Sequence, residues 1–429
     1  MYDEKLRELI KRLEYKRKRI DLRYKYYEMK ECVHEVREML PPAYRWMSST
    51  LGWCAKTVDT LADRLSFYSF SDDFYGMGDI YLENNQDILI DAVMLSALIC
   101  SCSFIHITKD DRGIRLYSID GGNATGDLDP STYLLTSGYA VLERDRNGHP
   151  LKEAYFTPGY TYYYVAGYNG PVEIEETGLN YPALVPVIYR PDARRPFGHS
   201  RITRACMELQ QGAMRTLKRA EISGDFYSFP QRYILGTSED REPMDKWRAT
   251  MSSFIEITKD DEGDKPVMGQ FSQQSMSPYL DQMRMMASLF AGETGLTVDD
   301  LGFVSDNPSS SEAIKAAHEN LRLCARKAQR NFSTGLLNAG YLAACYRDGR
   351  NYDRYDLALT KTNWQPVFEP DFSALSSIGD GAIKLNQAVP GYIDRETLRA
   401  LTGIEGGPTE ATASEVVAEA VQLAEEITE

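Results

Sequence analysis

The stretch GHSRITRACMELQQGAMRTLKRAEISGDFYSFPQRYILG, residues 198–236, decides the fold of this 429-residue chain. Its first part, residues 198–226, predicts a helix of about 28 residues, which at about 1.5 Å per residue is roughly 40 Å long. That length exceeds the three or four turns of an ordinary globular helix. Its apolar stripe is rich in small residues, such as Ala205, Cys206 and Ala213, and therefore favours close packing against another helix.

Three further segments follow this helix in an unusual order. Residues 229–271 predict a strand-rich insert, after which Ser277 as N-cap and Pro278 as first helical residue open a second helix that Gly292 and Gly295 end. Residues 297–308 are a loop by composition. A third helix of over thirty residues then extends to about Tyr346, and its start carries a capping box of Ser309 and Glu312.

The first half of the chain predicts an α+β domain with meandering antiparallel strands, over residues 40–190. Helices are expected at 46–65 and 88–98. Strand pairs are expected at 103–108 with 114–119, 140–144 with 153–156, and 161–165 with 172–175. The last two pairs turn at Asn-Gly dipeptides, the strongest short hairpin signal. The tail predicts helices near 378–388, 394–401 and 413–427.

Composition restricts the class of protein. The formal net charge of −15 argues against a simple duplex binder, which normally carries a basic surface. No run of 18 apolar residues occurs and the first residues lack an apolar signal core, so we expect no membrane span and no secretion signal. The seven cysteines are scattered and predict reduced thiols, with Cys100 and Cys102 on one strand face.

Two features leave alternatives open. The basic helix of residues 3–31 could touch nucleic acid, although a solvated face laced with acidic residues is the interpretation we favour. A tyrosine cluster, Tyr155 to Tyr168, could stack bases, but packing across a hairpin suits strand tyrosines better.

The sequence lacks the standard catalytic signatures. We find no phosphate-binding loop, no HExxH zinc motif and no nucleophile elbow. The acidic pairs Asp72–Asp73, Asp260–Asp261 and Asp299–Asp300 could bind a metal, but each lies beside turn residues where Asp is common. We therefore expect no enzyme, no metal and no cofactor.

Several segments, in the right order, resemble the Gp6-like portal family of tailed double-stranded DNA bacteriophages. They are residues 55–65 (AKTVDTLADRL), 96–109 (SALICSCSFIHITK), 198–236 as quoted above, and 309–330. The resemblance covers residues 25–405, with little recognisable sequence in the insert.

The resemblance implies an α+β portal fold in a ring, usually of twelve subunits, at one capsid vertex. Its implied parts are an α/β wing (1–197 with 310–370), stem helices (198–228 and 277–292), a small α/β clip (229–276), a tunnel loop (293–309) and a helical crown and tail (371–429). It also implies double-stranded DNA passing without sequence specificity during packaging and ejection. The implied partners are the large terminase, head completion or adaptor proteins, major capsid protein and scaffolding protein, with the protein in the virion and, during assembly, in the host cytoplasm.

Candidate site residues follow from these implied parts. An acidic ring of twelve would carry about −180 charges and repel phosphate, so a few cations would give sliding contact. The candidates for this DNA-channel band are Arg215, Lys218 and Arg219, which could instead pair with acidic neighbours across a subunit interface. The tunnel-loop candidates are Val298, Asp299, Asp300, Leu301 and Phe303, of which the apolar three would meet DNA sterically.

Two further sets are expected to contact proteins. Terminase or adaptor contacts are expected in the insert at Asp240, Arg241, Glu242, Lys246 and Trp247, although a buried tryptophan is equally compatible. Subunit-interface contacts are expected on one arc of the third helix, at Lys315, Arg322, Arg326 and Arg330. The competing classes are another structural phage component, such as a minor capsid or adaptor protein, and a metal-dependent DNA-processing enzyme.

Overall fold

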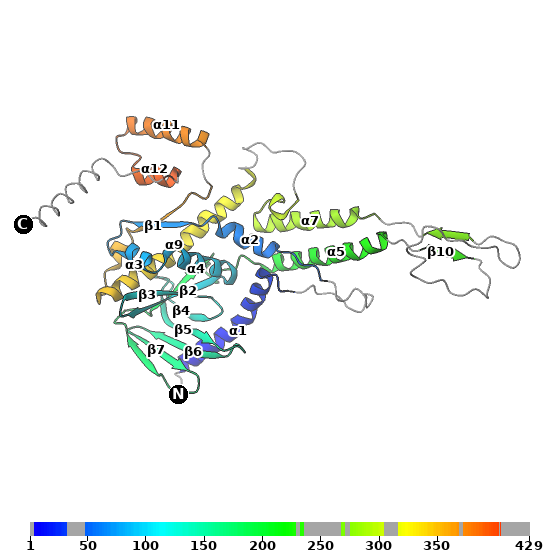
Figure 1. The fold of residues 1–429 in the computed structure, drawn as a ribbon. Coiled ribbons are helices and arrows are strands. Elements are labelled where there is room, and N and C mark those ends of the chain that lie inside the picture. Colours follow the sequence, from blue (N-terminus) through cyan, green and yellow to red (C-terminus); the bar gives the residue numbers. More distant parts are fainter. Residues whose placement is uncertain are drawn as a thin grey trace, which may run out of the picture.

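The fold is taken from a computed structural model that describes residues 4–31, 48–228, 232–235, 267–270, 275–303, 316–368, 372–402 and 404. An α/β body lies at one side, and two long helices leave it side by side with a small sheet beyond their ends (Figure 1). This arrangement separates the molecule into a body and a projecting helix pair.

The body contains two antiparallel sheets. The three-stranded sheet has the order β3 (Gly113–Ile119), β2 (Cys102–Asp110), β9 (Leu184–Ile188). The five-stranded sheet is a meander of β4 (Ala124–Leu128), β5 (Leu135–Arg144), β6 (Pro150–Thr157), β7 (Tyr160–Val165) and β8 (Glu173–Glu176). All three predicted strand pairs are confirmed.

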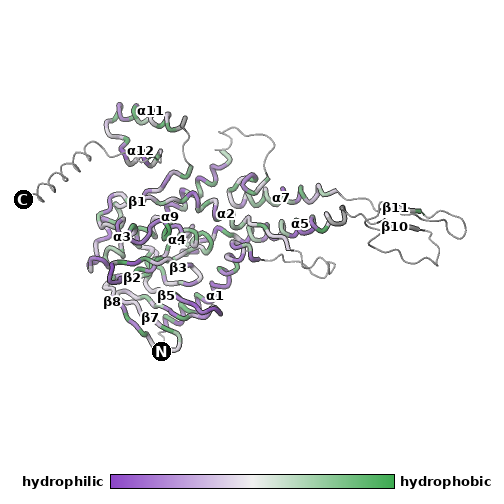
Figure 2. Tube along the Cα trace, viewed as in Figure 1, coloured by the Kyte–Doolittle hydropathy of each residue, from purple (hydrophilic) through white to green (hydrophobic). Residues whose placement is uncertain are grey.

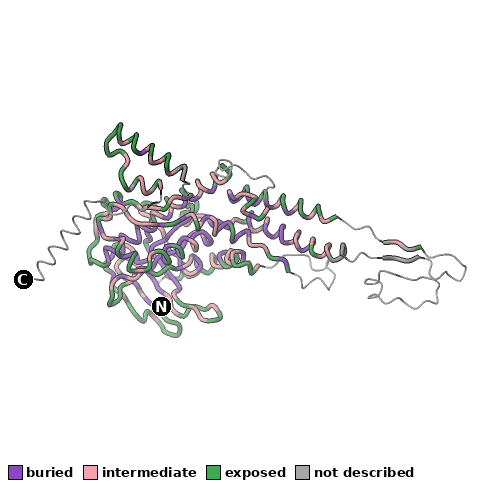
Figure 3. The backbone as a smooth tube through the Cα atoms, turned by 45° about the horizontal axis from the view of Figure 1, so that its top comes forward, coloured by how far each residue is buried: buried purple, intermediate pink, exposed green. Residues whose placement is uncertain are grey.

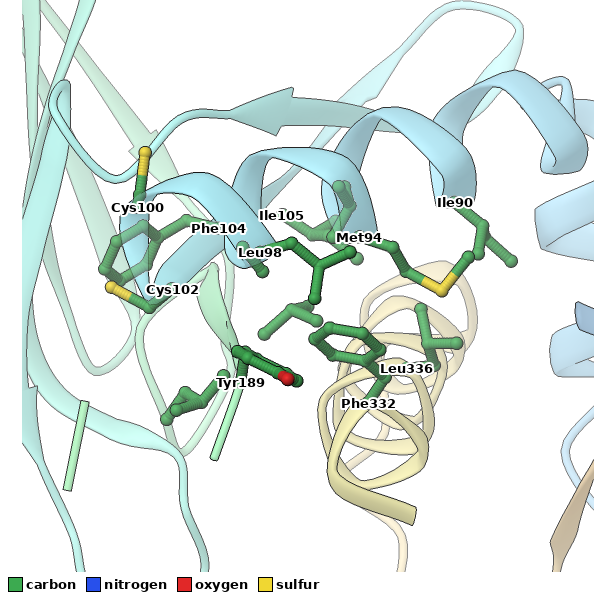
Figure 4. Packing of buried hydrophobic residues seen from close by; sticks show 14 of the residues in the cluster. Ile90, Met94, Leu98, Cys100, Cys102, Phe104, Ile105, Tyr189, Phe332 and Leu336 are labelled. Carbon is green, nitrogen blue, oxygen red and sulfur yellow. The ribbon is translucent and has the colours of Figure 1, made fainter. Parts of the chain in front are cut away.

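Helices cover the three-stranded sheet. The N-terminal half supplies α2 (Trp53–Ala62), α3 (Met77–Glu83) and α4 (Gln86–Cys100), and α9 (Glu319–Asp348) crosses from the C-terminal half. Figure 4 shows Phe332 and Leu336 of α9 among Leu98, Met94 and Tyr189. Phe332 and Leu336 are fully buried, so the core joins residues over two hundred positions apart in the sequence.

A second contact between the two halves of the sequence is a pair of strands. Strand β12 (Lys361–Trp364), which follows the short helix α10 (Arg354–Leu357), pairs antiparallel with β1 (Phe67–Ser71). The ring of Trp364 meets that of Phe67 edge-on, with centroids 5.6 Å apart. The last described helices, α11 (Phe372–Ala388) and α12 (Arg395–Thr402), confirm the predicted helices at 378–388 and 394–401. They are largely exposed, whereas buried residues gather in the body (Figure 3).

The N-terminal helix α1 (Glu4–Tyr27) packs on the five-stranded sheet. Its Leu6, Leu9 and Leu13 form a small cluster with side chains of β5 and β6. Arg12 donates to a carboxylate oxygen of Asp127 at 2.7 Å, and Lys16 donates to a backbone carbonyl. Several of its basic residues therefore hold the helix against the body, which the sequence did not reveal.

The projecting pair consists of α5 (Arg204–Ser228) and α7 (Ser277–Thr294), with β10 (Arg232–Leu235) and β11 (Val267–Gln270) paired antiparallel beyond them. Both helices mix hydrophilic and hydrophobic residues along their length (Figure 2). No helix within the described residues is long and apolar enough to cross a membrane. The predicted pair of long helices around a strand-containing insert is confirmed for the described part, but the first helix begins at Arg204 rather than at residue 198, because residues 198–203 are not helical.

Several sequence predictions were wrong in detail. The helix expected at 46–65 begins only at Trp53, since residues 48–52 are not helical. Helix α7 passes through Gly292 and ends at Thr294, followed by the cap residue Gly295, whose φ of 72° suits a residue without Cβ. Ser277 is its first residue rather than a side-chain cap.

One further prediction is wrong, and two lie outside the described residues. Cys100 and Cys102 do not share a strand face, because Cys100 ends α4 and Cys102 begins β2. Both are free thiols, as are four other cysteines. The capping box at Ser309 and Glu312 and the acidic helix at 413–427 lie outside the described residues.

Candidate functional site

The seam between α5 and α7 brings the two long helices close together. Gly212 lies against the thioether of Met286, whose Cε would be 3.1 Å from a Cβ at this position. Farther from the body, the hydroxyl groups of Ser223 and Tyr279 share a hydrogen bond of 2.7 Å. The buried side chains along the seam include Ala213, Ala287 and Phe290, so the predicted small-residue contact is present.

One buried cation anchors the pair to the body. The Arg201 guanidinium, 5 % exposed, donates to the carbonyl of Thr57 in α2 at 3.3 Å and to that of Thr294, the last residue of α7. A positive charge at the C-terminus of a helix is favoured by the helix dipole. Gln210 of α5 adds a second tie by accepting a 2.7 Å hydrogen bond from the backbone of Cys54.

The three predicted DNA-channel cations differ in exposure. Arg219 is exposed and Arg215 is half-buried. Lys218 is 6 % exposed and already has an interaction partner. The subunit therefore does not present three equivalent exposed cations, because successive positions of α5 face different neighbours.

The predicted tunnel-loop residues lie at the base of the pair. Residues Asp299–Leu301 form a short 3-10 helix, in which Asp300 accepts 2.8 Å hydrogen bonds from the backbone and hydroxyl of Thr297. Leu301 is buried in the main core, and Val298 and Phe303 pack against it, while Asp299 is exposed. Leu301 therefore belongs to the subunit's own core, whereas Val298 and Phe303 are only half-buried and their contact with DNA stays a prediction.

The predicted interface residues on α9 differ in whether they already have a partner within the subunit. Arg322 donates two hydrogen bonds to Glu319 on the same helix, and this pairing holds the pKa of Glu319 below its ordinary value. Arg326 and Arg330 are exposed. Lys315 lies outside the described residues, as do Asp240, Arg241, Glu242, Lys246 and Trp247, so these contacts remain predictions.

A polar pocket of about 780 Å³ lies between the two sheets. At its wall Glu175 accepts hydrogen bonds from Thr108, Tyr163 and Tyr346 at 2.6 to 2.9 Å. Burial lowers the pKa of His106 to about 4, so this side chain is neutral near pH 7. The hydroxyl groups around Glu175 thus connect its carboxylate to β2, β7 and α9.

A larger cleft of about 920 Å³ lies where α1, the turn before α5 and α9 meet. Eight lysine or arginine side chains line it, against two acidic ones. These cations come from four separate parts of the sequence, which is why no local pattern predicted the cleft. Among the described residues, no group of three or more His, Cys, Asp or Glu side chains is placed to hold a metal ion.

The sequence matches a protein-family model and known proteins. The family model described as phage portal protein, SPP1 Gp6-like, matches residues 6–429. The chain is 24 % identical to the portal protein of Mycobacterium phage L5 over 335 residues, which cover 74 % of this chain and 67 % of that protein. It is 25 % identical to the portal protein of Mycobacterium phage D29 over 341 residues, with the same coverage.

Solved structures are also similar, among them the neck of a native GTA particle computed with C12 symmetry, with 12 % identity, a TM-score of 0.43, and coverage of 83 % of this chain and 90 % of that one. The match of the family model over nearly the whole length is what decides the assignment. The chain belongs to the SPP1 Gp6-like family of phage portal proteins.

Proposed function

We propose that twelve copies of this chain form a ring at one capsid vertex, through which double-stranded DNA is packaged and later ejected. The protein would act as a structural conduit rather than as an enzyme. The observation that carries the proposal is the pair α5 and α7, which leaves the body side by side with a small sheet beyond it (Figure 1). Such pairs, repeated around an axis, form the wall of a channel.

The surface of the pair supports packing between copies. Leu280, Met285 and Leu289 on α7 are each more than half exposed in the isolated subunit. Exposed apolar side chains on a projecting helix are typical of surfaces that another protein covers. A neighbouring copy is the partner that ring formation supplies.

We assign the regions of the ring as follows. The body of residues 1–197 with 310–370 is the wing, α5 and α7 are the stem, and the segment with β10 and β11 belongs to the clip. The tunnel loop, expected at 293–309, would begin after Thr294, the last residue of α7, and α11 and α12 would belong to the crown. The large terminase and later the head completion proteins would dock on the clip, where Trp247 and its charged neighbours are the proposed contacts.

The DNA-facing residues are revised by the burial of individual side chains. Arg219, with Arg215 beside it, is the proposed channel cation, whereas the burial of Lys218 favours a role within the subunit. In the tunnel loop, Asp299 is the exposed candidate. A net charge of −15 per copy disfavours tight binding of phosphate, so DNA would slide past a few weak contacts.

End-on electron microscopy of the purified protein tests the proposal. We expect rings with a central hole and near twelvefold symmetry. Particles without a hole, or a chain that stays monomeric under assembly conditions, would contradict it. Replacement of Arg219 by Glu should leave the rings intact and reduce DNA packaging, with the exposed Arg146, on a hairpin of the body, replaced by Glu as the control.

A further inference from the structure

The cationic cleft carries charges that the described part of the subunit does not neutralise. Of its eight cations, seven form no ion pair with any described residue, and five of these seven are exposed: Arg19, Arg190, Arg195, Arg204 and Lys327. By contrast Arg12, at the edge of the same cleft, is bound to Asp127 and Glu8.

The two acidic residues of the cleft have other partners. Asp192 binds the ring of His199 at 2.5 Å and accepts hydrogen bonds from the backbone of Arg194 and Arg195. Glu293 accepts a hydrogen bond from Thr203. Burial lowers the pKa of Arg23, and the charges of Arg19 and Arg195 lower it further, because like charges lie close together here. An anionic partner would relieve this repulsion.

An acidic patch elsewhere on the body carries negative charges that form no ion pair with a described residue. Asp63 follows the end of α2, and Asp87 and Asp91 lie on the first turns of α4; all three are exposed and form no ion pair with a described residue. The pKa of Asp91 is raised, first by burial and then by the charges of Asp87 and Asp63. We call these three residues the acidic patch.

Apolar side chains accompany both charged surfaces. Ile88 is 74 % exposed beside the acidic patch, and Tyr15 is 74 % exposed in the wall of the cleft. Interfaces between proteins combine an apolar or aromatic centre with a charged rim. Each surface therefore has the composition of one half of an interface.

The two surfaces cannot neutralise each other within one subunit. Cys100, the last residue of α4, lines the cleft, and Asp91 and Asp87 lie nine and thirteen residues earlier on that helix. At about 1.5 Å per residue they are roughly 14 to 20 Å from it along the axis. This separation exceeds the screening length of about 8 Å at physiological salt.

We propose that the cationic cleft of one copy receives the acidic patch of α2 and α4 of the next copy in the ring. An interface between two different surfaces of identical chains is head-to-tail, which is the kind that closes into rings. The inference rests on the proposed ring and names the charged contact that would hold it. Specific charge complementarity also fixes which faces meet.

Two other anions could enter the cleft. The phosphate backbone of DNA would fit its charge, but the net charge of −15 opposes such binding. Residues 405–429 of this chain hold seven glutamates and no lysine or arginine. We favour the acidic patch because it too has charges without partners, so one contact satisfies both surfaces.

Charge reversal in three versions of the full-length chain tests the inference. The first carries R19E, R190E, R195E, R204E and K327E in the cleft, the second D63K, D87K and D91K in the patch, and the third all eight changes. Native mass spectrometry at equal chain concentration measures the assembled fraction. The exposed residues Arg146 and Asp111, on hairpin turns of the body, provide the control changes R146E and D111K.

We expect the first two versions to lose assembly, with an apparent dissociation constant raised about tenfold or more. The third should assemble again, as should the first two when co-expressed, because each interface then joins opposite charges. Circular dichroism confirms that every version is folded, and the control changes should assemble like the unmodified chain.

Three results would overturn the inference. The first is that the first two versions form rings at the level of the unmodified chain, and the second is that the third version folds but stays unassembled. The third is that deletion of residues 405–429 abolishes the rings, which would identify that segment as the occupant of the cleft. Intact rings of the first version that no longer retain DNA would identify DNA instead. If the unmodified chain forms no ring, the proposed function itself fails.

Discussion

The body and the projecting pair of helices are stabilised in different ways. In the body, large side chains such as Phe332 and Tyr81 are fully buried between helices and a sheet. In the pair, the two helices meet along a single seam in which Gly212 and Ala213 lie with the larger Met286 and Phe290, and α7 exposes Leu280 and Leu289. The body can therefore fold as a unit, whereas the pair depends on its anchor to the body and, in our proposal, on neighbouring copies.

The largest expected effect is in the core of the body. Phe332→Ala should lower the free energy of unfolding by about 3–5 kcal/mol, because it leaves a cavity among fully buried residues. Chemical denaturation measures this loss, in the charge-reversed version of the cleft so that subunit dissociation does not contribute. The control is Leu323→Ala on the same helix, where the side chain is 53 % exposed and a change of under about 0.5 kcal/mol is expected. Equal losses in the two variants would contradict the account of the core.

The next effect depends on pH and also belongs to the body. His106 has a native pKa of about 4 against an ordinary value of about 6.5, so the unfolded chain binds a proton that the native chain does not. The neutral His106 side chain contributes fully to the free energy of unfolding above about pH 6.5. This contribution, of order 3 kcal/mol, is lost as the pH falls toward 4. Stability curves at several pH values should therefore converge for the unmodified chain and for His106→Gln as the pH is lowered. Parallel curves would show that His106 does not titrate in this way.

The junction between the two regions should be more sensitive than its surroundings. Arg201→Met removes the hydrogen bonds to the carbonyls of Thr57 and Thr294 and should cost about 2–3 kcal/mol. Hydrogen exchange should rise most at the end of α7. Arg194→Met, at an exposed position seven residues earlier, is the control. Unchanged exchange at residues 290–294 in the Arg201 variant would mean that the pair has another anchor.

The smallest expected changes in stability come from two glycines of α5, one at an open position and one in the seam with α7. Gly224 has open space where a Cβ would lie, so Gly224→Ala should stabilise the helix by about 0.5–1 kcal/mol. At Gly212 the same Cβ would press on Met286, and the strain should cancel that gain. Thermal unfolding of the two variants gives the difference. A larger gain at Gly212 than at Gly224 would indicate that the seam is loosely packed.

Local patterns predicted the parts of the body and the order of the long helices. The hairpin at Asn147 and Gly148 was predictable because two residues determine the turn, and the helix around Ile88 because its apolar residues recur along one short segment. The family resemblance came from the order of such segments, since each motif alone is weak. It anticipated the assignment to phage portal proteins.

Contacts between distant residues could not be predicted in this way. The pairing of Phe67 with Trp364 joins strands almost three hundred residues apart, and no local signal identifies the partner. The burial of Lys218 and Leu301 depends on what packs against them in space. The cationic cleft likewise exists only after α1, the turn before α5 and α9 have come together.

The mass of the purified assembly tests the central claim most directly. Native mass spectrometry should give a species of about twelve times the 48.6 kDa of one chain, with few smaller forms at moderate salt. That result would establish the ring on which the channel and the charged interface depend. A predominant species of 48.6 kDa at the same concentration and salt would contradict the account.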